Sequence, residues 1–400
     1  MTRQRILFVD DDPNIAAGLR NLLRKDRHRW DVEFATSGES ALLAFAAKAF
    51  DIIVCDMRMP GMDGATLLTQ IKRDYPETTR IVLSGQTEPD GIVRAIPVTH
   101  QFLCKPCDGE VLRSVLQRTC DLRTRLVSDT IKKIVGQVHR LPSVPGLYWE
   151  LVNAASRNDV ATAEIAAIVE RDPAMTAKIL QLVNSAYFGL AQHIASIPQA
   201  VNYLGIDLVK GLTLTAHLFE SQQDSRLGGL SLAGLQKHSL LTALLGRRFA
   251  STATLRQEIF TAAIVHDIGK VLLARGFPEP FQAMMAKRDD TQPAHVVEKE
   301  TFGATHAEVG AYLLGIWGLP FSIVEAVAFH HEPGLGTVSD PELLAVLHVA
   351  EVLTGTGPGC GDPGSIPLDL GFLETVGLAD RLPEWEARAR EYFEKLPGQG

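Results

Sequence analysis

Several polar residues in the first third of this 400-residue chain directly follow short apolar runs: Asp10 and Asp11, Asp56, Ser84 and Lys105. Clustered carboxylates bind Mg²⁺, a hard cation that takes oxygen ligands. The metal and a lysine ammonium can neutralise a phosphoryl group during its transfer. This set predicts that Asp56 accepts a phosphoryl group and that the Ser84 hydroxyl donates to its oxygens. Taken alone, Asp56 could simply be an acid that opens a turn.

Histidines and acids in the second half of the chain form another candidate set: His238, His266, Asp267, His306, His330, His331 and Glu351. The tract HDIGK, residues 266–270, follows an apolar helical run, and the other histidines each lie next to such a run. Sites rich in imidazole favour transition metals over Mg²⁺. The alternative for each histidine taken alone is a hydrogen-bonded core residue.

The composition narrows the class of protein. An apolar fraction of 46% is ample for hydrophobic cores, and a formal net charge of −8 without a long basic run argues against nucleic acid as a partner. Five cysteines fit a reducing cytosol, and the isolated pair Cys104 and Cys107 argues against zinc or redox use. We find no signal peptide and no apolar stretch long enough to span a membrane, so we expect a cytoplasmic protein.

Apolar runs at residues 6–9, 32–35, 52–55, 81–83 and 101–104 predict five strands. Helical patterns alternate with these runs, beginning at Pro13, after Ser37-Gly38 and near Leu67. Alternation at this spacing predicts a doubly wound parallel sheet. Because the carboxyl ends of parallel strands share one edge, the polar residues that follow the strands are expected to converge there.

Four motifs, VDDD, DMRMPGMDG, LSG and FLCKP, occur in order at the predicted strand ends. With these motifs, residues 5–122 resemble the receiver domain of two-component response regulators. The resemblance implies that a sensor histidine kinase phosphorylates Asp56. It implies a Mg²⁺ site made by Asp11, Asp56 and the backbone carbonyl of Arg58, with Asp10 acting nearby. It also implies three switch residues: Ser84, Phe102 and Lys105.

Residues 110–138 have the pattern of one long helical stretch. Leu112, Val115, Leu122 and Leu126 keep helical spacings, and basic residues that we expect to be exposed surround them: Arg113, Arg118, Arg123, Arg125, Lys132 and Lys133. One interpretation is a signalling helix that pairs two chains in a homodimer. The other is an ordinary last receiver helix followed by an exposed linker. The apolar seam formed by the four residues Leu112, Val115, Leu122 and Leu126 is too short to decide between these interpretations.

From Leu141 onward nearly every pattern is that of an amphipathic helix. Asp159 or Thr162 can cap one helix, and another starts at Asp172-Pro173. The motifs LPSVPGL, ERDPAMTAKIL, LVNSAYFG, SIPQAVNYLG and HDIGK make residues 138–331 resemble the HDOD domain, a helical output module related to HD phosphohydrolases. The predicted organisation is a receiver at 1–122, a linker or signalling helix at 123–137, an all-α HDOD domain at 138–335 and a helical extension at 336–400.

In HD phosphohydrolases a His-Asp pair helps to hold one or two metals that activate a water for attack on phosphorus. The resemblance therefore makes the histidine set a candidate transition-metal site, with Asp267 and Lys270 as candidate catalytic residues. Lys270 could also simply end its helix favourably. Two features depart from the pattern. Glu351 stands where an aspartate is expected, and the tract FHHEPGLG lacks the GYP sequence associated with cyclic-di-GMP hydrolysis.

The function predicted from the sequence is that of a phosphorelay response regulator. Phosphorylation of Asp56 would control an HDOD domain that acts on a downstream signalling protein through protein–protein contacts. The alternative is a phosphorylation-regulated, metal-dependent phosphohydrolase. A DNA-binding regulator is a third interpretation, which the acidic balance and the absence of a recognition-helix motif disfavour.

Overall fold

The computed structural model describes residues 3–85, 98–105, 109–125, 129–137, 141–143, 150–151, 154, 160–184, 194–205, 219–221, 226–287, 292–335, 338–355 and 367–395. The chain divides into two compact units. Residues 1–140 make most of the first unit, and residues 141–180, 194–314 and 319–400 make the second. Among the described residues, no helix is long and apolar enough to cross a membrane.

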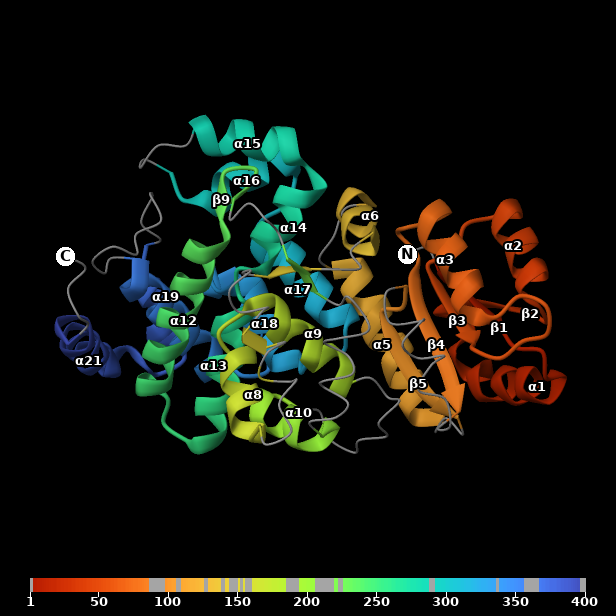
Figure 1. Cartoon of the computed structure of the whole chain (residues 1–400), viewed down its shortest axis with the longest axis horizontal. Helices are drawn as coiled ribbons and strands as arrows, with labels where there is room; N and C mark the ends of the chain where they lie inside the picture. Colours follow the sequence, from red (N-terminus) through yellow and green to blue (C-terminus); the bar gives the residue numbers. More distant parts are fainter. Residues whose placement is uncertain are drawn as a thin grey trace. The chain divides into compact units, whose positions relative to one another are not determined.

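The first unit is built on a parallel sheet with five strands in the order β2-β1-β3-β4-β5, drawn in red to orange in Figure 1. The strands are β1 (Gln4–Val9), β2 (Trp30–Ala35), β3 (Ile52–Asp56), β4 (Thr79–Gly85) and β5 (Gln101–Lys105). Every residue of the central strand β3 is buried, as expected for a parallel strand that is covered on both faces. The predicted five-stranded sheet is thus confirmed.

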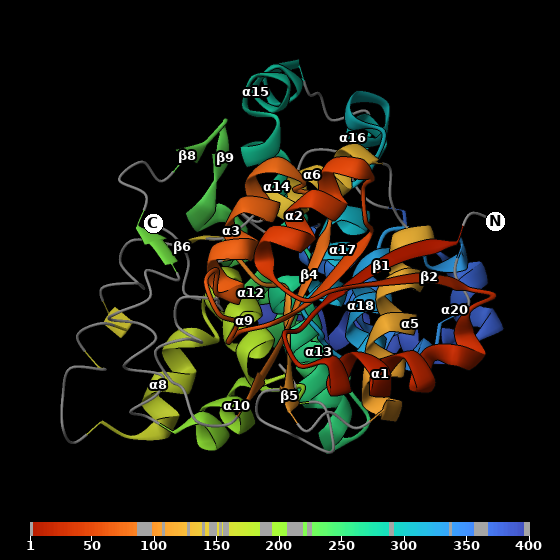
Figure 2. The same cartoon turned by 90° about the vertical axis from the view of Figure 1, so that its right-hand side faces the viewer.

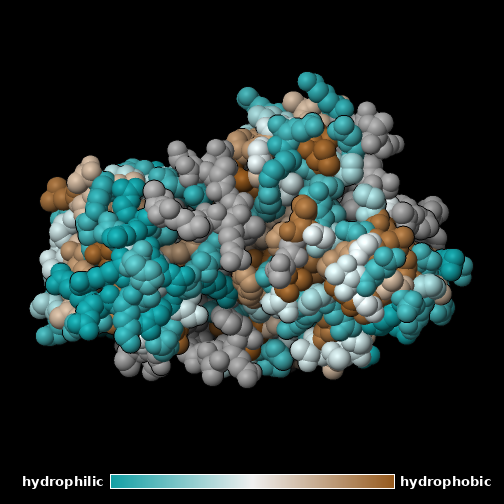
Figure 3. Space-filling model, turned by 180° about the vertical axis from the view of Figure 1, so that it is seen from behind, coloured by the Kyte–Doolittle hydropathy of each residue, from teal (hydrophilic) through white to brown (hydrophobic). Residues whose placement is uncertain are grey.

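Helices cover both faces of this sheet (Figure 2). On one face, α1 (Pro13–Leu22), η1 (Leu23–Asp26) and α5 (Gly109–Arg125) contribute apolar side chains to the same core as the strands. On the other face lie α2 (Gly38–Ala47) and α3 (Gly64–Asp74), which pack against each other. A further helix, α6 (Asp129–Gln137), packs on α3. In Figure 3 the visible apolar side chains form small groups between hydrophilic ones, which is normal for a folded surface.

Side-chain caps begin three helices of the first unit, as their sequence chemistry dictates. Asp12, Ser37 and Asp63 each accept a backbone N–H from the helix that follows. At Gly64, a Cβ would lie 2.2 Å from the carbonyl oxygen of Asp56. Glycine therefore allows α3 to begin immediately beside the end of β3, which is where the acidic residues gather.

The helical stretch predicted at 110–138 is described as two helices, α5 and α6, with residues 126–128 outside the described part. Leu112 and Val115 pack into the core of the sheet, so they belong to an ordinary last helix of the α/β unit and not to an exposed seam. The side chains of Leu122, Leu126, Arg123, Arg125 and Lys133 lie outside those described.

Three basic residues are partly buried where we expected exposed ones: Arg113, Arg118 and Lys132. Burial lowers the pKa of the Arg118 guanidinium to about 10. Its Nε and Nη2 atoms have no hydrogen-bond partner among the described residues. Helical periodicity placed Arg118 on the polar face, but α5 is covered over more of its circumference than one apolar stripe requires.

The second unit is mainly helical. Its described α-helices are α8 (Thr162–Val169), α9 (Pro173–Val183), α10 (Ile197–Leu204), α12 (Leu232–Phe249), α13 (Ala253–Val265), α14 (Ile268–Gly276), α15 (Pro278–Lys287), α16 (Ala294–Phe302), α17 (His306–Ile316), α18 (Phe321–Phe329), α19 (Pro341–Gly355), α20 (Leu370–Thr375) and α21 (Leu382–Glu394). Helix α12 packs on α13 and α19, and α18 packs on both of these helices. This packing buries the inward faces of four helices that carry predicted site residues.

Two details of the second unit correct the sequence analysis. The unit is not purely α-helical, because β6 (Leu141–Ser143) pairs with β7 (Phe219–Ser221), and β8 (Arg226–Leu227) pairs with β9 (Leu230–Ser231). Thr162 is the first residue of α8 and not its cap, since the N-cap is Ala161 and makes no side-chain hydrogen bond. Asp159 lies outside the described residues.

Candidate functional sites

Three carboxylates gather at the carboxyl end of the sheet. One oxygen from each of Asp10, Asp11 and Asp56 lies within 4.8 Å of the other two. Asp10 follows β1 and Asp56 ends β3, and these neighbouring strands are in register, with Val9 opposite Cys55. Asp10 and Asp56 are buried, whereas Asp11 is exposed. The structure thus brings together three acids that the sequence places at the ends of two separate strands, β1 and β3.

Lys105 reaches this acidic cluster from β5, across the intervening strand β4. Its Nζ lies 2.7 Å from Oδ2 of Asp10 and 2.9 Å from Oδ2 of Asp56. Burial raises the pKa of the Asp56 carboxyl, and Lys105 opposes this shift. Burial would lower the pKa of Lys105, but the hydrogen bonds to Asp10 and Asp56 outweigh it and raise the pKa. The ammonium group is therefore charged and holds Asp56 in place.

The acidic cluster fits a hard divalent cation. Three carboxylates against one ammonium leave an excess of negative charge at this edge. Oxygen is the donor that Mg²⁺ prefers, and the exposure of Asp11 leaves room for the waters that this ion retains. Arg58 follows closely in the loop, and its backbone N–H donates to the Asp56 carboxylate.

Two of the three predicted switch residues, Ser84 and Phe102, are placed only by their backbone. Ser84 lies in β4 opposite Cys104, and Phe102 lies in β5 opposite Val82. The side chains of Ser84, Phe102 and Cys104 are outside those described, as is Cys107. The switch roles of Ser84 and Phe102 therefore stay predictions.

The second candidate site lies among the helices of the second unit. Most of its residues stand at helix ends: His266 after α13, Asp267 before α14, His306 at the start of α17, and His330 and His331 after α18, while His238 and Glu351 lie within α12 and α19. All except His238 are buried. Seven residues from distant parts of the chain thus meet in one region of the unit.

These residues form two groups of ligand atoms. Asp267, His306, His330 and His331 make a four-residue group, and His238, His266 and Glu351 make a three-residue group. In each group the atoms lie within 4.8 Å of one another. The groups adjoin each other, because Nε2 of His266 lies 3.1 Å from Oε2 of Glu351 and 3.4 Å from Oδ2 of Asp267.

Hydrogen bonds on the far side of two rings show which nitrogen faces inward. Nδ1 of His266 lies 2.6 Å from the carbonyl oxygen of Ala263, and Nδ1 of His330 lies 2.7 Å from that of Val327. Since a carbonyl oxygen can only accept, Nδ1 carries a proton in both rings, and the neutral imidazole has its lone pair on Nε2. Both Nε2 atoms are buried and have no hydrogen-bond partner among the described residues.

A carboxylate from α16 orients a third ring. Oε2 of Glu298 lies 2.6 Å from Nδ1 of His306. Nε2 of His306 therefore faces the cluster, 3.0 Å from Oδ1 of Asp267 and 2.9 Å from Nε2 of His331. Metal-binding histidines are commonly held in this way through the ring nitrogen that does not bind the metal.

The donor set of the histidine cluster fits a transition metal. Nδ1 of His331 is also buried without a hydrogen-bond partner in the described part of the chain. Buried polar atoms without partners are costly and rare, so several ligand atoms of this kind at one point fit a bound cation. Burial would raise the pKa of Asp267 and of Glu351, but the neighbouring histidines, together with Lys270 at Asp267, outweigh it and hold both pKa values well below the usual range. Both carboxylates are thus ionised, as ligands must be.

Sequence reasoning missed three residues that support this site. Glu298 and His295 lie three residues apart on α16, and the His295 ring stacks on His331 with centroids 4.5 Å apart. His348 lies three residues before Glu351 on α19, and its Nδ1 is 2.8 Å from the carbonyl oxygen of His330. The spacing of His348 from Glu351 places both on one helix face, so this residue could have been found.

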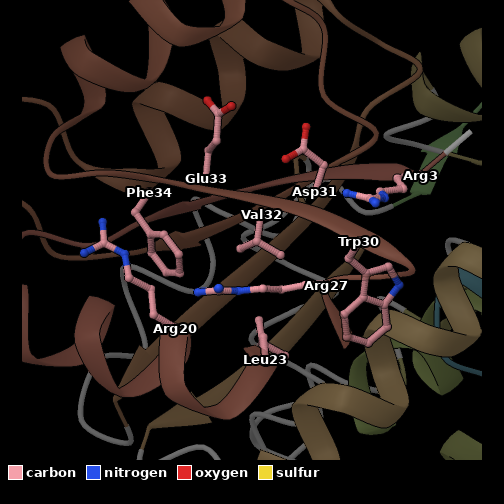
Figure 4. Close-up of a pocket in the computed structure, with 9 residues that line it drawn as sticks. All are labelled: Arg3, Arg20, Leu23, Arg27, Trp30, Asp31, Val32, Glu33 and Phe34. Atoms are coloured by element: carbon pink, nitrogen blue, oxygen red, sulfur yellow. The ribbon is translucent and has the colours of Figure 1, made fainter. Parts of the chain in front are cut away.

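A pocket of about 500 Å³ in the first unit involves none of the predicted site residues. It is lined by Arg3, Arg20, Leu23, Arg27, Trp30, Asp31, Val32, Glu33 and Phe34. In Figure 4 the side chains of Arg20 and Arg27 lie beside Phe34 and Val32, on the opposite side of β2 from Asp31 and Glu33. The pocket therefore lies along β2, at the edge of the sheet, whereas the acidic cluster lies at the ends of the inner strands β1 and β3.

Comparison with known proteins gives matches to both units. The response regulator receiver domain matches residues 6–117, and the HDOD domain matches residues 141–333. An uncharacterized protein from Treponema pallidum (strain Nichols) is 25% identical over 240 residues, which are 56% of this chain and 44% of that protein. The transcriptional regulatory protein ZraR of Escherichia coli O157:H7 is 32% identical over 155 residues, 38% of this chain and 34% of that protein. The chain thus spans less than half the length of these relatives.

Solved structures give similar matches. A virulence factor from Campylobacter jejuni subsp. jejuni is 20% identical, with 67% of this chain and 99% of that chain covered and a TM-score of 0.53, which is a likeness in fold alone. The MmoQ response regulator from Methylococcus capsulatus str. Bath is 24% identical, with 62% and 98% covered and a TM-score of 0.48. The signal receiver domain of an HD domain-containing protein from Pseudomonas fluorescens Pf-5 is 32% identical, with 31% and 98% covered and a TM-score of 0.30.

Proposed function

Because the chain is a response regulator that joins a receiver domain to an HDOD domain, we propose that phosphorylation of Asp56 controls a metal-dependent phosphohydrolase centre in the HDOD domain. The observation that carries the proposal is the inward set of unpartnered ligand atoms, above all Nε2 of His266 and Nε2 of His330. A purely structural cluster of histidines would satisfy these nitrogens with N–H or O–H donors.

In the receiver, a carboxylate oxygen of Asp56 attacks the phosphorus of a phosphohistidine on a sensor kinase. A P–O bond to Asp56 forms as the P–N bond to the kinase breaks. Asp11, Asp56 and the carbonyl of Arg58 would hold Mg²⁺, which supplies charge neutralisation, with Asp10 nearby. The ammonium of Lys105, already 2.9 Å from Asp56, neutralises charge that develops on the phosphoryl oxygens.

In the HDOD domain, the four-residue and three-residue groups would hold one or two transition-metal ions. Such ions polarise a phosphoryl oxygen and supply a nucleophile at neutral pH. Glu298 and the carbonyls of Ala263 and Val327 keep the imidazoles turned inward. Lys270, whose Nζ is 2.7 Å from Oδ2 of Asp267, places a positive charge beside the four-residue group, where it can bind a substrate phosphate.

Burial of the ligands favours a second candidate function. The side chains of His266, His306 and His330 are fully buried, and that of His238 is only 12% exposed. Structural metal sites are closed in this way, whereas catalytic ones keep an open position. In this alternative the metal stabilises the helical fold, and the output is the protein–protein contact with a downstream signalling protein that the sequence analysis favours.

The test is elemental analysis of the purified full chain, followed by a screen of phosphoesters and phosphodiesters with and without phosphorylation of Asp56. Metal with turnover that changes on phosphorylation supports the phosphohydrolase. Metal without turnover supports the structural alternative, which a pull-down with and without phosphorylation then examines. A folded wild type without any transition metal contradicts both assignments of the histidine cluster.

A further inference from the structure

Arg80 is a charged side chain that is only 1% exposed, near the end of β4 that lies away from the acidic cluster. Its guanidinium donates to four backbone carbonyls: those of Val98 at 2.6 Å, Thr78 at 2.9 Å, Pro76 at 3.3 Å and Gly136 at 2.6 Å. These carbonyls belong to the loop before β4, the residues before β5 and helix α6. One side chain therefore connects three separate segments of the receiver unit.

His100, the residue before β5, closes the same network. The backbone N–H of Arg80 lies 3.0 Å from Nδ1 of His100, and Nη2 of Arg80 lies 3.2 Å from Nε2. A neutral imidazole has one lone pair in its plane, so it accepts only one of these two donors as a hydrogen bond. These contacts join the start of β4 to the residue before β5. We call the hydrogen bonds that Arg80 makes with the four carbonyls and with His100 the Arg80 network.

Helix α6 is held by this network at its C-terminal end. Gly136 lies in the last turn of α6, where carbonyls have no partner within the helix. The Arg80 guanidinium satisfies one of them and complements the negative end of the helix dipole. The contact is close, since a Cβ at Gly136 would lie 1.5 Å from the carbonyl oxygen of Pro76. Ile131 and Val135, which share one face of α6, are fully buried.

The two strands that meet at the Arg80 network also carry two predicted switch residues, Ser84 toward the other end of β4 and Phe102 near the start of β5. Ser84 lies four residues beyond Arg80 on β4, roughly 13 Å along an extended strand, and Phe102 lies two residues beyond His100 on β5. We infer that Arg80 is the joint through which movement of β4 against β5 reaches α6 and the chain that leads to the HDOD domain.

This inference rests on the proposed phosphorylation of Asp56. The guanidinium is a rigid, planar fork whose donors are directed at four backbone carbonyls and at the His100 ring. A shift of one strand relative to the other cannot preserve all of these hydrogen bonds. Phosphorylation of Asp56 therefore loosens α6 from the receiver, and the unphosphorylated state holds it firmly.

Amide hydrogen exchange of residues 129–137 in the full chain tests the inference. In Arg80→Met the carbonyl of Gly136 loses its partner, and in Gly136→Ala the new Cβ forces α6 away from Pro76 although alanine favours helix more than glycine does. Exchange should rise at least about tenfold in both variants, because local release of α6 replaces global unfolding as the route of exchange. Arg73→Met is the control, since Arg73 is exposed on α3 and pairs with Asp74.

The second arm measures the wild type with and without a stable phosphoryl mimic and Mg²⁺. Faster exchange of residues 129–137 in the mimic-bound state supports the joint. Unchanged exchange of residues 129–137 in both variants overturns the attachment of α6 to Arg80. If Arg80→Met does not fold, the result for Gly136→Ala alone decides whether α6 is attached in this way. If exchange of residues 129–137 rises in the variants but does not change when the wild type binds the mimic, the coupling between Asp56 and α6 is overturned. Direct labelling of Asp56 is followed in parallel, so a protein that is not phosphorylated is recognised separately.

Discussion

Oε2 of Glu298 lies 2.6 Å from Nδ1 of His306 and also accepts the backbone N–H of His306 at 2.8 Å. One carboxylate thus fixes both the main chain and the ring of the residue that begins α17. Glu298 is 1% exposed, so water does not compete for these hydrogen bonds. The orientation of His306 in the four-residue group therefore depends on a side chain from a different helix, α16.

Glu298→Gln should weaken metal binding without removing a ligand. The amide is uncharged and presents one acceptor oxygen, so it no longer makes the His306 ring more basic. Loss of a hydrogen-bonding partner behind a ligand typically lowers metal affinity about 10- to 100-fold, which competition with a chromogenic chelator would measure. Glu300→Gln is the matched control, because Glu300 is exposed on the same helix. Equal affinities in the two variants would show that His306 is not a ligand.

Substitutions in the two ligand groups should change the number of bound ions differently. If two ions bind, His238→Ala weakens only the three-residue group and should reduce the metal content from about two ions per chain to about one. His266→Ala combined with Asp267→Ala removes one ligand from each group and should abolish binding. Elemental analysis measures both contents, with the exposed His28→Ala as the control. A double variant that keeps its metal would contradict this ligand assignment.

The receiver unit was predictable because its information is local. Each apolar run is short, each is followed by its functional residue, and the parallel topology brings all strand ends to one edge. The convergence of Asp10, Asp56 and Lys105 needed no further information. The ligand types of the histidine cluster were predictable for a similar reason, since each stands next to an apolar helical run.

The partners of those ligands were not predictable from spacing. Glu298 lies eight residues before His306 in the sequence, with a turn between α16 and α17, so no helical period relates the two. The Arg80 network is a second case, because Gly136 and His100 are far from Arg80 in sequence and contribute a backbone carbonyl and an imidazole ring. An isolated arginine in a strand pattern gives no sign that four carbonyls will surround it.

Asp56→Asn should abolish labelling by a radioactive small phosphodonor in the presence of Mg²⁺. The amide cannot act as the nucleophile, and the loss of one negative charge also weakens the cation site. Asp12→Asn is a matched control, because Asp12 caps α1 outside the three-acid cluster and asparagine caps a helix equally well. Labelling of the Asp56 variant at the wild-type level would place the phosphoacceptor elsewhere.

Gly64→Ala should destabilise the receiver domain and disturb the acidic cluster. The added Cβ would lie 2.2 Å from the carbonyl oxygen of Asp56, so α3 must move away from the end of β3. Overpacking of this kind costs about 1–3 kcal/mol, measurable as a lower urea midpoint. The control is Gly18→Ala, where no atom lies within 4 Å of the new Cβ and alanine should stabilise α1 by up to about 1 kcal/mol. Equal stability of both variants would show that α3 can shift without strain.

Lys178 should make the stability of the HDOD domain depend on pH. It lies in α9 and is 2% exposed, and burial lowers its pKa from 10.5 to about 7. Between these two pH values the unfolded chain binds more protons at this residue than the folded chain. The free energy of unfolding therefore rises with pH through this window, by about 1–4 kcal/mol in total. Below the folded pKa, both states carry the charge and the penalty is constant.

Lys178→Met removes the titrating group and nearly preserves the length of the side chain. Urea unfolding between about pH 7 and 9.5 should lose this rise in the variant, which should be more stable than the wild type at the lower pH. Lys287→Met, at the exposed end of α15, should keep the wild-type slope. A slope that survives in Lys178→Met would mean that the buried ammonium is stabilised in the folded state, and that another group accounts for the pH dependence.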